Sequence, residues 1–583
     1  MNINVHGHLF TLRTVLSREA VSVMTQRLRD RGLPELMVSA VSGLLEDLLD
    51  RPELLDEREL LARLLGHLRG ASGFDAFVER RLSRLPFELA VRGEGLEELS
   101  VGALRQALDQ LTTAMRDEGD PAMRPYDLVE TLRLAARGTI TEVADALLEQ
   151  MEPEDALVAL MMDIRAPDEP ERDRLNFLRQ VEGTREAALQ RPGRILPFFA
   201  IHPDRPDHFE LMEAGVEEGA FLGVKLYPSL GYTVDSPELR RVFEFCVDRD
   251  VPILLHCSHG GFYRRKEFID YCDPAHWEKV LQGELSELRV CFAHFGGWDA
   301  LGRPGGLDEN TWGGRILRLM REKPQAYTDL AFHTDQMHDP EDEEHYFTTL
   351  EELLQEEGLE QRILFGTDSW LLRMEMTEEL FWKYYRERMP PESFRKIAEL
   401  GPRAFLGFPE KDGSGGGDGS NEQGEAPRAN IQRHVDFLVR NREKVGTEPA
   451  SWVVELADVS FHADREPPDW RRRTYPTQCT YRLAREYMTG AQKRGGYGAN
   501  RELRLNELRY FRPRDPNFPG VVCGGLARDL VGCCVDGGGA FAPGWDRNRA
   551  VGRLQEVFRK GEKRLVDVAV LLDTIFHFEE ALV

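Results

Sequence analysis

The sequence predicts an α/β protein whose main part is a closed barrel of eight parallel β/α units, and three observations predict this class. Short apolar runs recur between residues 156 and 368, and amphipathic helical stretches separate them. The runs are almost continuously apolar, which is typical of parallel strands covered by helices. With INVHGH near the N-terminus as the first strand, the runs number eight, as in a (β/α)8 TIM barrel.

The expected strands follow one another along the chain with helical segments between most of them. They are INVHGH (3–8), ALVALMMDI (156–164), RILPFFAI (194–201), FLGVKLYP (221–228), VPILLHC (251–257), LRVCFAHF (288–295), QAYTDLAF (325–332) and RILFGTD (362–368). The helical segments include SPELRRVFEFCVDR and GGRILRLMREK, in which apolar residues recur at spacings of three and four.

A long helical block interrupts the barrel pattern after the first strand. Between about residues 12 and 150, segments such as REAVSVMTQRLRD and ERELLARLLGHLRG show helical periodicity, and no convincing strand separates them. We therefore expect a helical insertion on the catalytic face of the barrel. Such a block is more often a scaffold or a dimer surface than a moving lid, so a homo-oligomer is one expectation.

The C-terminal third is organised differently. Residues 410–429 are rich in Gly, Ser and acidic residues, a composition that cannot bury a core and predicts a flexible linker. The linker separates a barrel domain, residues 1–409, from a separate C-terminal module, residues 430–583. The module mixes strand-like runs such as SWVVEL with a helical end, which favours an α+β fold of unknown function.

Composition narrows the classes of function. The net charge is −26, and residues 429–583 hold 25 Lys+Arg against 21 Asp+Glu, so the acidic charge lies in the rest of the chain. An acidic body argues against general nucleic-acid binding. No apolar run approaches the ~18 residues that a membrane span needs, and the first strand starts too early to leave room for a secretory signal. Eight cysteines without a CxxC pair suggest no disulfide scaffold. We expect a cytoplasmic protein.

Residues able to bind metal collect at the strand ends. In such barrels catalytic groups lie at the carboxyl ends of the strands. The residues found there are His6 and His8 (strand 1), Lys225 and Tyr227 (strand 4), His256 with His259 just beyond (strand 5), His294 (strand 6) and Asp368 (strand 8). His202 follows strand 3. Any one of these could be structural, and Asp368 alone could be a helix N-cap. Their joint placement predicts a metal site.

Alternation along the strands supports this prediction. Residues i and i+2 of a strand share a face, so His6 and His8 point the same way, as do Lys225 and Tyr227. The same alternation assigns Cys291 to the outer face, as core packing. Imidazole and carboxylate ligands together suit a divalent ion: zinc first, with manganese, iron or nickel as alternatives.

The set HxH, Lys, His, His and Asp on strands 1, 4, 5, 6 and 8 resembles the amidohydrolase superfamily of metal-dependent hydrolases. The phrases GVKLYP, PILLHC, AHFGG and LFGTDS are most similar to its branch that includes the aminocarboxymuconate-semialdehyde decarboxylase-like enzymes. The resemblance covers about residues 1–9 and 155–408. Asn4 stands where relatives commonly carry an acidic residue.

The resemblance implies roles for the individual residues. His6, His8, His256 and Asp368 would hold a divalent metal. In binuclear relatives a carboxylated lysine on strand 4 bridges two metals and the strand-6 histidine is a ligand, which places Lys225 and His294 in the ligand set. In mononuclear relatives the strand-6 histidine is an acid/base instead. One or two metal ions per chain therefore remain open.

The expected activity is that of a metal-dependent hydrolase, which would use an activated water to cleave an amide, ester or lactone of a small molecule. Asp368 and His294 would be the catalytic groups, and Tyr227, His259 and Arg264 the substrate-binding ones. Non-oxidative decarboxylation of an aromatic or unsaturated acid is the alternative on the same site. A second alternative is a scaffold or regulatory barrel in a protein that binds a partner through residues 430–583.

Overall fold

The structure is a computed structural model that describes residues 1–30, 35–50, 57–75, 100–104, 106–108, 131, 134, 137–373, 375–409 and 427–457. The chain forms two compact units, Met1–Ser460 and Phe461–Val583. All described residues lie in the first unit. Among them, no helix is both long and apolar enough to cross a membrane.

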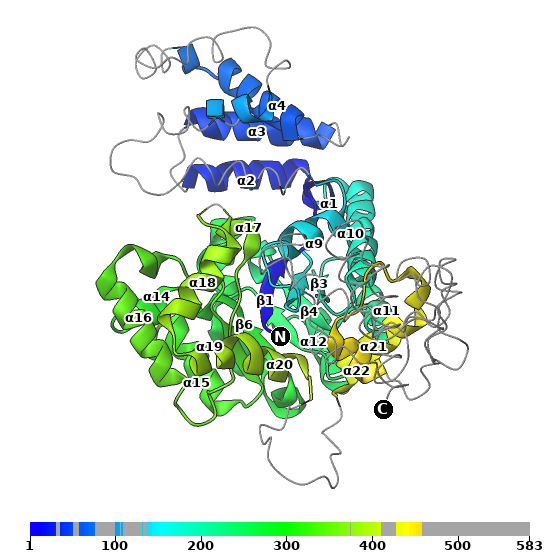
Figure 1. Cartoon of the computed structure of the whole chain (residues 1–583), viewed down its shortest axis with the longest axis vertical. Helices are drawn as coiled ribbons and strands as arrows, with labels where there is room; N and C mark the ends of the chain where they lie inside the picture. Colours follow the sequence, from blue (N-terminus) through cyan, green and yellow to red (C-terminus); the bar gives the residue numbers. More distant parts are fainter. Residues whose placement is uncertain are drawn as a thin grey trace, which may run out of the picture. The chain divides into compact units, whose positions relative to one another are not determined.

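Eight parallel strands form the barrel predicted from the sequence (Figure 1). They are β1 (Ile3–His8), β2 (Ala156–Leu160), β3 (Ile195–Ile201), β4 (Gly223–Leu226), β5 (Ile253–Leu255), β6 (Val290–Phe292), β7 (Ala326–Asp329) and β8 (Ile363–Leu364). Each strand pairs with the next in sequence. The Val5 amide donates to the Phe365 carbonyl over 3.0 Å, which joins the chain after β8 back to β1. The (β/α)8 prediction is thereby confirmed.

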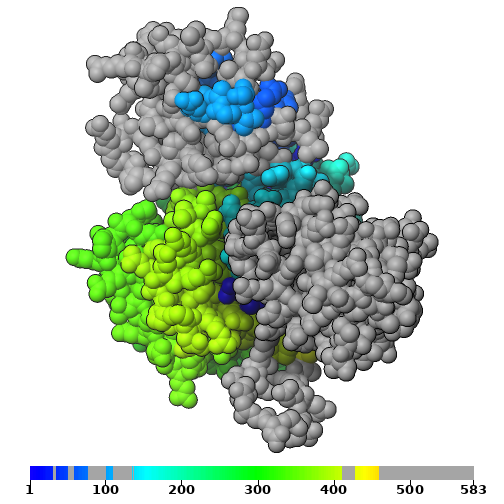
Figure 2. Space-filling model, in the orientation of Figure 1, coloured from blue at the N-terminus to red at the C-terminus, as the bar shows by residue number. Residues whose placement is uncertain are grey.

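Helices cover the outside of the strands. They are α10 (Pro170–Gln190), α11 (His208–Glu218), α12 (Pro237–Asp248), α13 (Trp277–Val280), α14 (Asp299–Gly302), α15 (Trp312–Glu322), α16 (Pro340–Leu353), α17 (Ser369–Leu372), α18 (Glu378–Arg388), α19 (Pro391–Arg395) and α20 (Gly401–Leu406). Several begin at side-chain caps, such as Ser236, whose hydroxyl accepts from the Leu239 amide. Figure 2 shows the last β/α units of the barrel, coloured green to yellow-green, as one continuous surface.

Strand composition explains why the barrel closes. Every strand residue from Ile3 to Leu364 is buried, and most are aliphatic or aromatic, because the inner face fills the barrel and the outer face meets the helices. The exceptions are polar side chains near the carboxyl ends, among them Lys225 and Asp329. Burying such groups is costly without partners, so their location marks the part of the barrel where chemistry is placed.

The insertion after β1 is helical, as the periodicity predicts. Its described elements are α1 (Leu12–Val15), α2 (Arg18–Asp30), α3 (Glu35–Asp50), α4 (Glu57–Gly70) and α9 (Ile140–Leu148). Helix α3 packs between α2 and α4. At the start of α9, Thr139 and Glu142 form a capping box, and the helix then packs against α10.

Two helices beyond the predicted linker also belong to the first unit. They are α21 (Ala429–Arg440) and α22 (Ser451–Ala457). Helix α21 buries Ile431, Val435 and Leu438, spaced by four and three residues, and packs against α11. The sequence assigned these helices to the C-terminal module, whereas their apolar face covers the barrel. The predicted linker core, residues 410–426, and the rest of the module lie outside the described residues.

Candidate metal centre

The two histidines of β1 lie inside the barrel with one ring nitrogen each left over. His6 Nδ1 lies 2.9 Å from Asp329 Oδ2, and because a carboxylate only accepts, Nδ1 carries the proton. The lone pair of His6 is therefore on Nε2, which is buried and has no hydrogen-bond partner. His8 Nδ1 is likewise buried without a partner. A side chain on Gly7 would meet Leu157 at 2.4 Å, so glycine between the histidines lets β1 pack closely on β2.

The histidines after β5 and β6 face each other. His256 Nδ1 lies 3.1 Å from His294 Nε2, while His294 Nδ1 lies 2.8 Å from the Ala331 carbonyl and His256 Nε2 lies 3.2 Å from the Gly260 carbonyl. In neutral rings, donation to both carbonyls turns the lone pairs of His256 and His294 towards each other. Two lone pairs at this distance repel unless a cation or a proton lies with them. Burial lowers the pKa of both histidines, to about 4 for His294, so a proton is disfavoured near neutral pH.

Asp368 is held in a strained conformation at the end of the β8 segment. Its φ of 53° lies in the left-handed region, and its amide donates to the His6 carbonyl over 2.8 Å. It occupies the N-cap position of α17, yet its carboxylate forms no capping hydrogen bond. One carboxylate oxygen lies 3.9 Å from His8 Nε2. His294, with a φ of 63°, is a second left-handed residue at the same centre.

A polar network fixes β1 against the end of β8. Asn4 donates from Nδ2 to Thr367 Oγ1 over 2.7 Å, and Asn4 Oδ1 accepts from the amides of His6 and Thr367. The Thr367 hydroxyl also contacts Glu378 at 3.0 Å. Asn4, which stands where relatives commonly carry an acid, thus positions the backbone on either side of the site.

These residues form two overlapping groups able to hold a metal ion. One consists of His6, His8 and Asp368 and the other of His6, His294 and Asp329, with potential ligand atoms within 4.8 Å of one another in each. His256 joins them through its contact with His294. All are buried, so the chemistry of the donor set and the orphaned nitrogens both fit a divalent cation.

Lys225 projects into the same interior. It is fully buried, and its Nζ has no hydrogen-bond partner. Burial lowers the pKa of Lys225 to about 8, opposed by the carboxylates of Asp329 and Asp368. Tyr227, two residues on, stacks on the His256 ring with a centroid distance of 4.1 Å. The structure therefore brings Lys225 and Tyr227 beside the histidines.

Asp329, at the end of β7, is a residue that sequence reasoning missed. Its side chain is inaccessible to solvent, and its Oδ1 accepts from the amides of His294 and Ala331 over 2.8 and 3.0 Å. The available signal was an acid at the carboxyl end of an apolar strand, the same signal that identified Asp368. Asp329 fixes the tautomer of His6 and the backbone of His294 at once.

The prediction from strand alternation that Cys291 lies on the outer face was wrong. Its Sγ lies 3.9 Å from Asp329 Oδ2, inside the barrel rather than on the outer face. The reason is that β6 ends at Phe292 and His294 adopts a left-handed conformation, so strand alternation does not extend from Cys291 to His294.

Two residues that the sequence predicts to bind substrate lie outside the metal-binding groups. His259 is exposed and stacks on Trp312, with ring centroids 3.8 Å apart. Arg264 forms a close ion pair with Glu19 of α2 at 2.5 Å. Neither contributes an atom to the metal-binding groups found in the described part of the chain.

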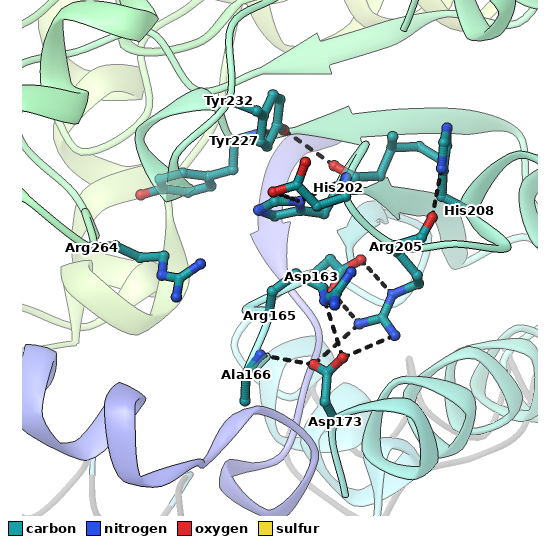
Figure 3. Close-up of polar contacts among 12 residues, drawn as sticks. Asp163, Arg165, Ala166, Asp173, His202, Arg205, His208, Tyr227, Tyr232 and Arg264 are labelled. Carbon is teal, nitrogen blue, oxygen red and sulfur yellow. Dashed lines mark hydrogen bonds and ion pairs between the residues drawn. The ribbon is translucent and has the colours of Figure 1, made fainter. Parts of the chain in front are cut away.

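A second buried cluster lies after β2 and β3 (Figure 3). Arg205 pairs with Asp163 at 2.5 Å and with Asp173 at 3.3 Å, and Arg165 reaches Asp173 at 3.1 Å. Asp173 Oδ1 also accepts from the Ala166 amide. Nearby, burial lowers the pKa of His202 to about 3, and its Nε2 has no hydrogen-bond partner.

Comparison with known proteins agrees with the resemblance seen in the motifs. A family model described as amidohydrolase matches residues 149–408. The match begins after β1, so His6 and His8 lie outside it. No curated protein matches the chain.

Several solved structures are similar to part of the chain. A protein from Pseudomonas putida assigned as a 2-pyrone-4,6-dicarboxylic acid hydrolase shares 16% identity over 45% of this chain and 87% of its own, with a TM-score of 0.32. A 2,6-dihydroxybenzoate decarboxylase bound to 2,6-dihydroxybenzoate shares 15% over 44% and 86%, with a TM-score of 0.31. An amidohydrolase from Burkholderia multivorans with bound HEPES shares 16% over 48% and 92%, with a TM-score of 0.33.

The family match covers β2 to β8, and it includes Lys225 of β4 and the residues His256, His294 and Asp368 that follow β5, β6 and β8. The barrel part of this chain is therefore similar to the amidohydrolases.

Proposed function

We propose that the protein is a metal-dependent hydrolase that cleaves an amide, ester or lactone of a small molecule. His6, His8, His256 and Asp368 would hold a divalent cation, zinc in the first place. The observation that carries the proposal is the state of His6: Asp329 holds its Nδ1 proton, the lone pair on buried Nε2 has no partner, and His6 belongs to both groups of residues able to hold a metal ion. A neutral, oriented imidazole of this kind is what a metal ligand requires.

A bound divalent cation would supply Lewis-acid activation of a water molecule and of the substrate carbonyl. The chain supplies the proton transfers. Asp368, whose carboxylate lies 3.9 Å from His8 Nε2, is placed to accept the proton of the attacking water and to pass it to the leaving group. His294 Nε2, whose lone pair is oriented by donation from Nδ1 to the Ala331 carbonyl, is placed to accept a proton during turnover.

Whether the Lys225 amine is carboxylated would determine whether the centre holds one metal ion or two. A lysine must be neutral to react with carbon dioxide and form a carbamate. The lowered pKa of about 8 gives Lys225 a larger neutral fraction near neutral pH than an exposed lysine has. A carboxylated Lys225 and His294 would together hold a second ion, whereas an unmodified Lys225 would leave a centre for one ion.

Metal analysis of the purified full chain tests the proposal. We expect about one or two divalent ions per chain in the wild type and none in the double variant His6→Ala/His8→Ala. His434→Asn is the matched control, because His434 is a buried histidine of α21 away from the cluster, and its metal content should equal that of the wild type. A wild type without metal, or an unchanged metal content in the double variant, contradicts the proposal.

A product assay separates the reactions that this site can perform. A panel of lactones, esters and amides is compared with a panel of aromatic and unsaturated acids, for which released carbon dioxide is measured. Turnover of the first panel supports hydrolysis, and carbon dioxide from the second assigns decarboxylation instead. A metal-loaded protein that turns over neither panel favours the scaffold alternative, in which residues 430–583 would bind a partner.

A further inference from the structure

A wide cleft lies between the helical insertion and the loop after β5. It has a volume of about 1350 Å³ and is lined by α2, α3, the end of α4 and residues 263–266. Pockets that hold small molecules usually span about 300–1,000 Å³, so the cleft has room for a molecule of that size. None of the metal-binding residues lines it.

The lining of the cleft is cationic although the chain is acidic. Among the described residues that line it, six are Arg or Lys and two are Glu, whereas the whole chain carries a net charge of −26. The cationic residues are Arg18, Arg27, Arg29, Arg264, Arg265 and Lys266, and the acidic ones are Glu35 and Glu46. A concave surface lined by one sign of charge concentrates its potential and attracts ligands of the opposite sign.

Some of these cations are already neutralised and others are not. Arg29 pairs with Glu35 at 3.0 Å, and Arg264 pairs with Glu19. Arg18, Arg265 and Lys266 are exposed, and no carboxylate among the described residues lies within salt-bridge distance of any of them. Their charges therefore remain available to a ligand.

Arg27 connects the two walls of the cleft. Its Nη2 donates to the Gly261 carbonyl over 2.6 Å, and its guanidinium lies over the Tyr263 ring, 4.0 Å from the centroid. These contacts hold α2 against the loop after β5 and fix the spacing of cations on opposite sides. Hydroxyl groups of Ser22 and Ser39 add hydrogen-bond donors to the lining.

We propose that this cleft is a binding site for a small molecule that carries two or more anionic groups, either carboxylates or phosphates. Cations from α2 (Arg18) and from the loop after β5 (Arg265 and Lys266) would each contact one of these groups. Arginine favours such ligands because its planar guanidinium can donate two hydrogen bonds to one carboxylate or phosphate. The site is separate from the metal centre and does not depend on the proposed hydrolase activity.

Titration calorimetry on the full chain tests this site with two probes, inorganic pyrophosphate and propane-1,2,3-tricarboxylate. Because both probes also chelate metals, each titration is made with protein as purified and with protein dialysed against a chelator. We expect binding of at least one probe in both preparations, weakened strongly by added salt. Pyrophosphate alone would indicate a phosphorylated ligand, and the tricarboxylate a polycarboxylate.

Charge-neutral variants localise the binding. Arg265→Gln/Lys266→Gln should weaken it at least 10-fold. The matched control Arg240→Gln/Lys383→Gln removes one arginine and one lysine that are exposed on α12 and α18, and should bind as the wild type does. Absence of binding in the wild type, binding lost on chelation, or equal weakening in the control overturns the proposal.

Discussion

The barrel of this chain contains two buried polar clusters near the carboxyl ends of its strands, and they differ in how completely their groups are satisfied. After β2 and β3, Arg205 is paired with Asp163 and Asp173, and Arg165 is paired with Asp173, so two positive and two negative charges are matched within the protein. The second cluster joins residues of β1 to residues that follow β5, β6 and β8. In it, one ring nitrogen each of His6 and His8 is buried without a hydrogen-bond partner. The first cluster therefore stabilises the fold, whereas the second leaves nitrogen lone pairs available to a ligand.

An unpartnered nitrogen alone does not identify a site. His434 Nε2 and His208 Nε2 are also buried without hydrogen bonds, yet neither belongs to a metal-binding group among the described residues. A neutral imidazole tolerates one unused lone pair at a modest cost. What distinguishes the centre is convergence, since one potential ligand atom each of His6, His8 and Asp368 lies within 4.8 Å of the other two.

The largest expected effect is on turnover. Asp368→Asn removes the proton acceptor while keeping a residue that tolerates the left-handed backbone. On a substrate found by the product assay, kcat should fall by about 10²–10⁴-fold with the fold intact, because general-base catalysis contributes on this scale. Steady-state kinetics and circular dichroism provide the measurement.

Asp250→Asn is the matched control for this change, since Asp250 is also a left-handed aspartate, with a φ of 54°, but pairs with Arg289 and Arg428 away from the centre. Its kcat should stay near that of the wild type. Near-normal turnover of Asp368→Asn would remove Asp368 from the proton transfer.

The next largest expected effect is on stability and concerns the cluster of Arg205, Asp163 and Asp173. Arg205→Met leaves Asp163 and Asp173 buried without their common partner. Removing one member of a buried ion pair costs about 3–5 kcal/mol of unfolding free energy. Chemical denaturation should show this loss, while the metal content of protein that folds stays that of the wild type.

Arg249→Met provides the comparison, because Arg249 pairs with Glu217 on the surface and exposed ion pairs add little to stability. If Arg205→Met were no more destabilising than Arg249→Met, or released the metal, the contrast between the two clusters would fail.

Much of the barrel could be predicted because a short stretch of sequence is enough to identify each strand. Eight apolar runs identify the strands, and parallel strands bring their carboxyl ends to one rim whatever the details of packing. The placement of His6, His8, His256, His294 and Asp368 near one another follows from that rule alone. Lys225 follows from it in the same way.

What could not be predicted depends on contacts between distant segments. The bond from His6 to Asp329 spans 323 residues, and no local pattern pairs them. The pairing of Arg264 with Glu19 depends on where α2 lies over the loop after β5. The inward position of Cys291 depends on a left-handed turn at His294, which apolar periodicity does not reveal.

A smaller effect, on metal affinity, is expected for Asp329, which was not predicted from the sequence. Asp329→Asn keeps the shape of the side chain but removes the charge that orients His6 Nδ1. Metal affinity should fall about 10–100-fold, the range for a group that orients a ligand. Competition with a metal-sensitive dye measures it, with Cys291→Ala as a neighbour control that changes little. An unchanged affinity would make Asp329 purely structural.

The smallest effect concerns a buried histidine outside the centre. Burial lowers the pKa of His434 to about 4, opposed by its hydrogen bond to the Gly219 carbonyl. Between this value and the unfolded pKa of about 6.5 the unfolded chain binds a proton that the folded chain does not, so stability is complete above that range and falls as pH falls. From pH 7 to 5.5 His434 should account for a loss of about 1 kcal/mol.

Urea denaturation of the wild type and of His434→Asn at both pH values measures this contribution. The variant has no group at this position that titrates in the range, so its loss of stability on acidification should be smaller than that of the wild type by about 1 kcal/mol. Because His434 lies on α21, the same result would show that α21 is folded against the barrel in solution. Equal losses in the two proteins would mean that His434 titrates normally, and hence that α21 does not cover the barrel.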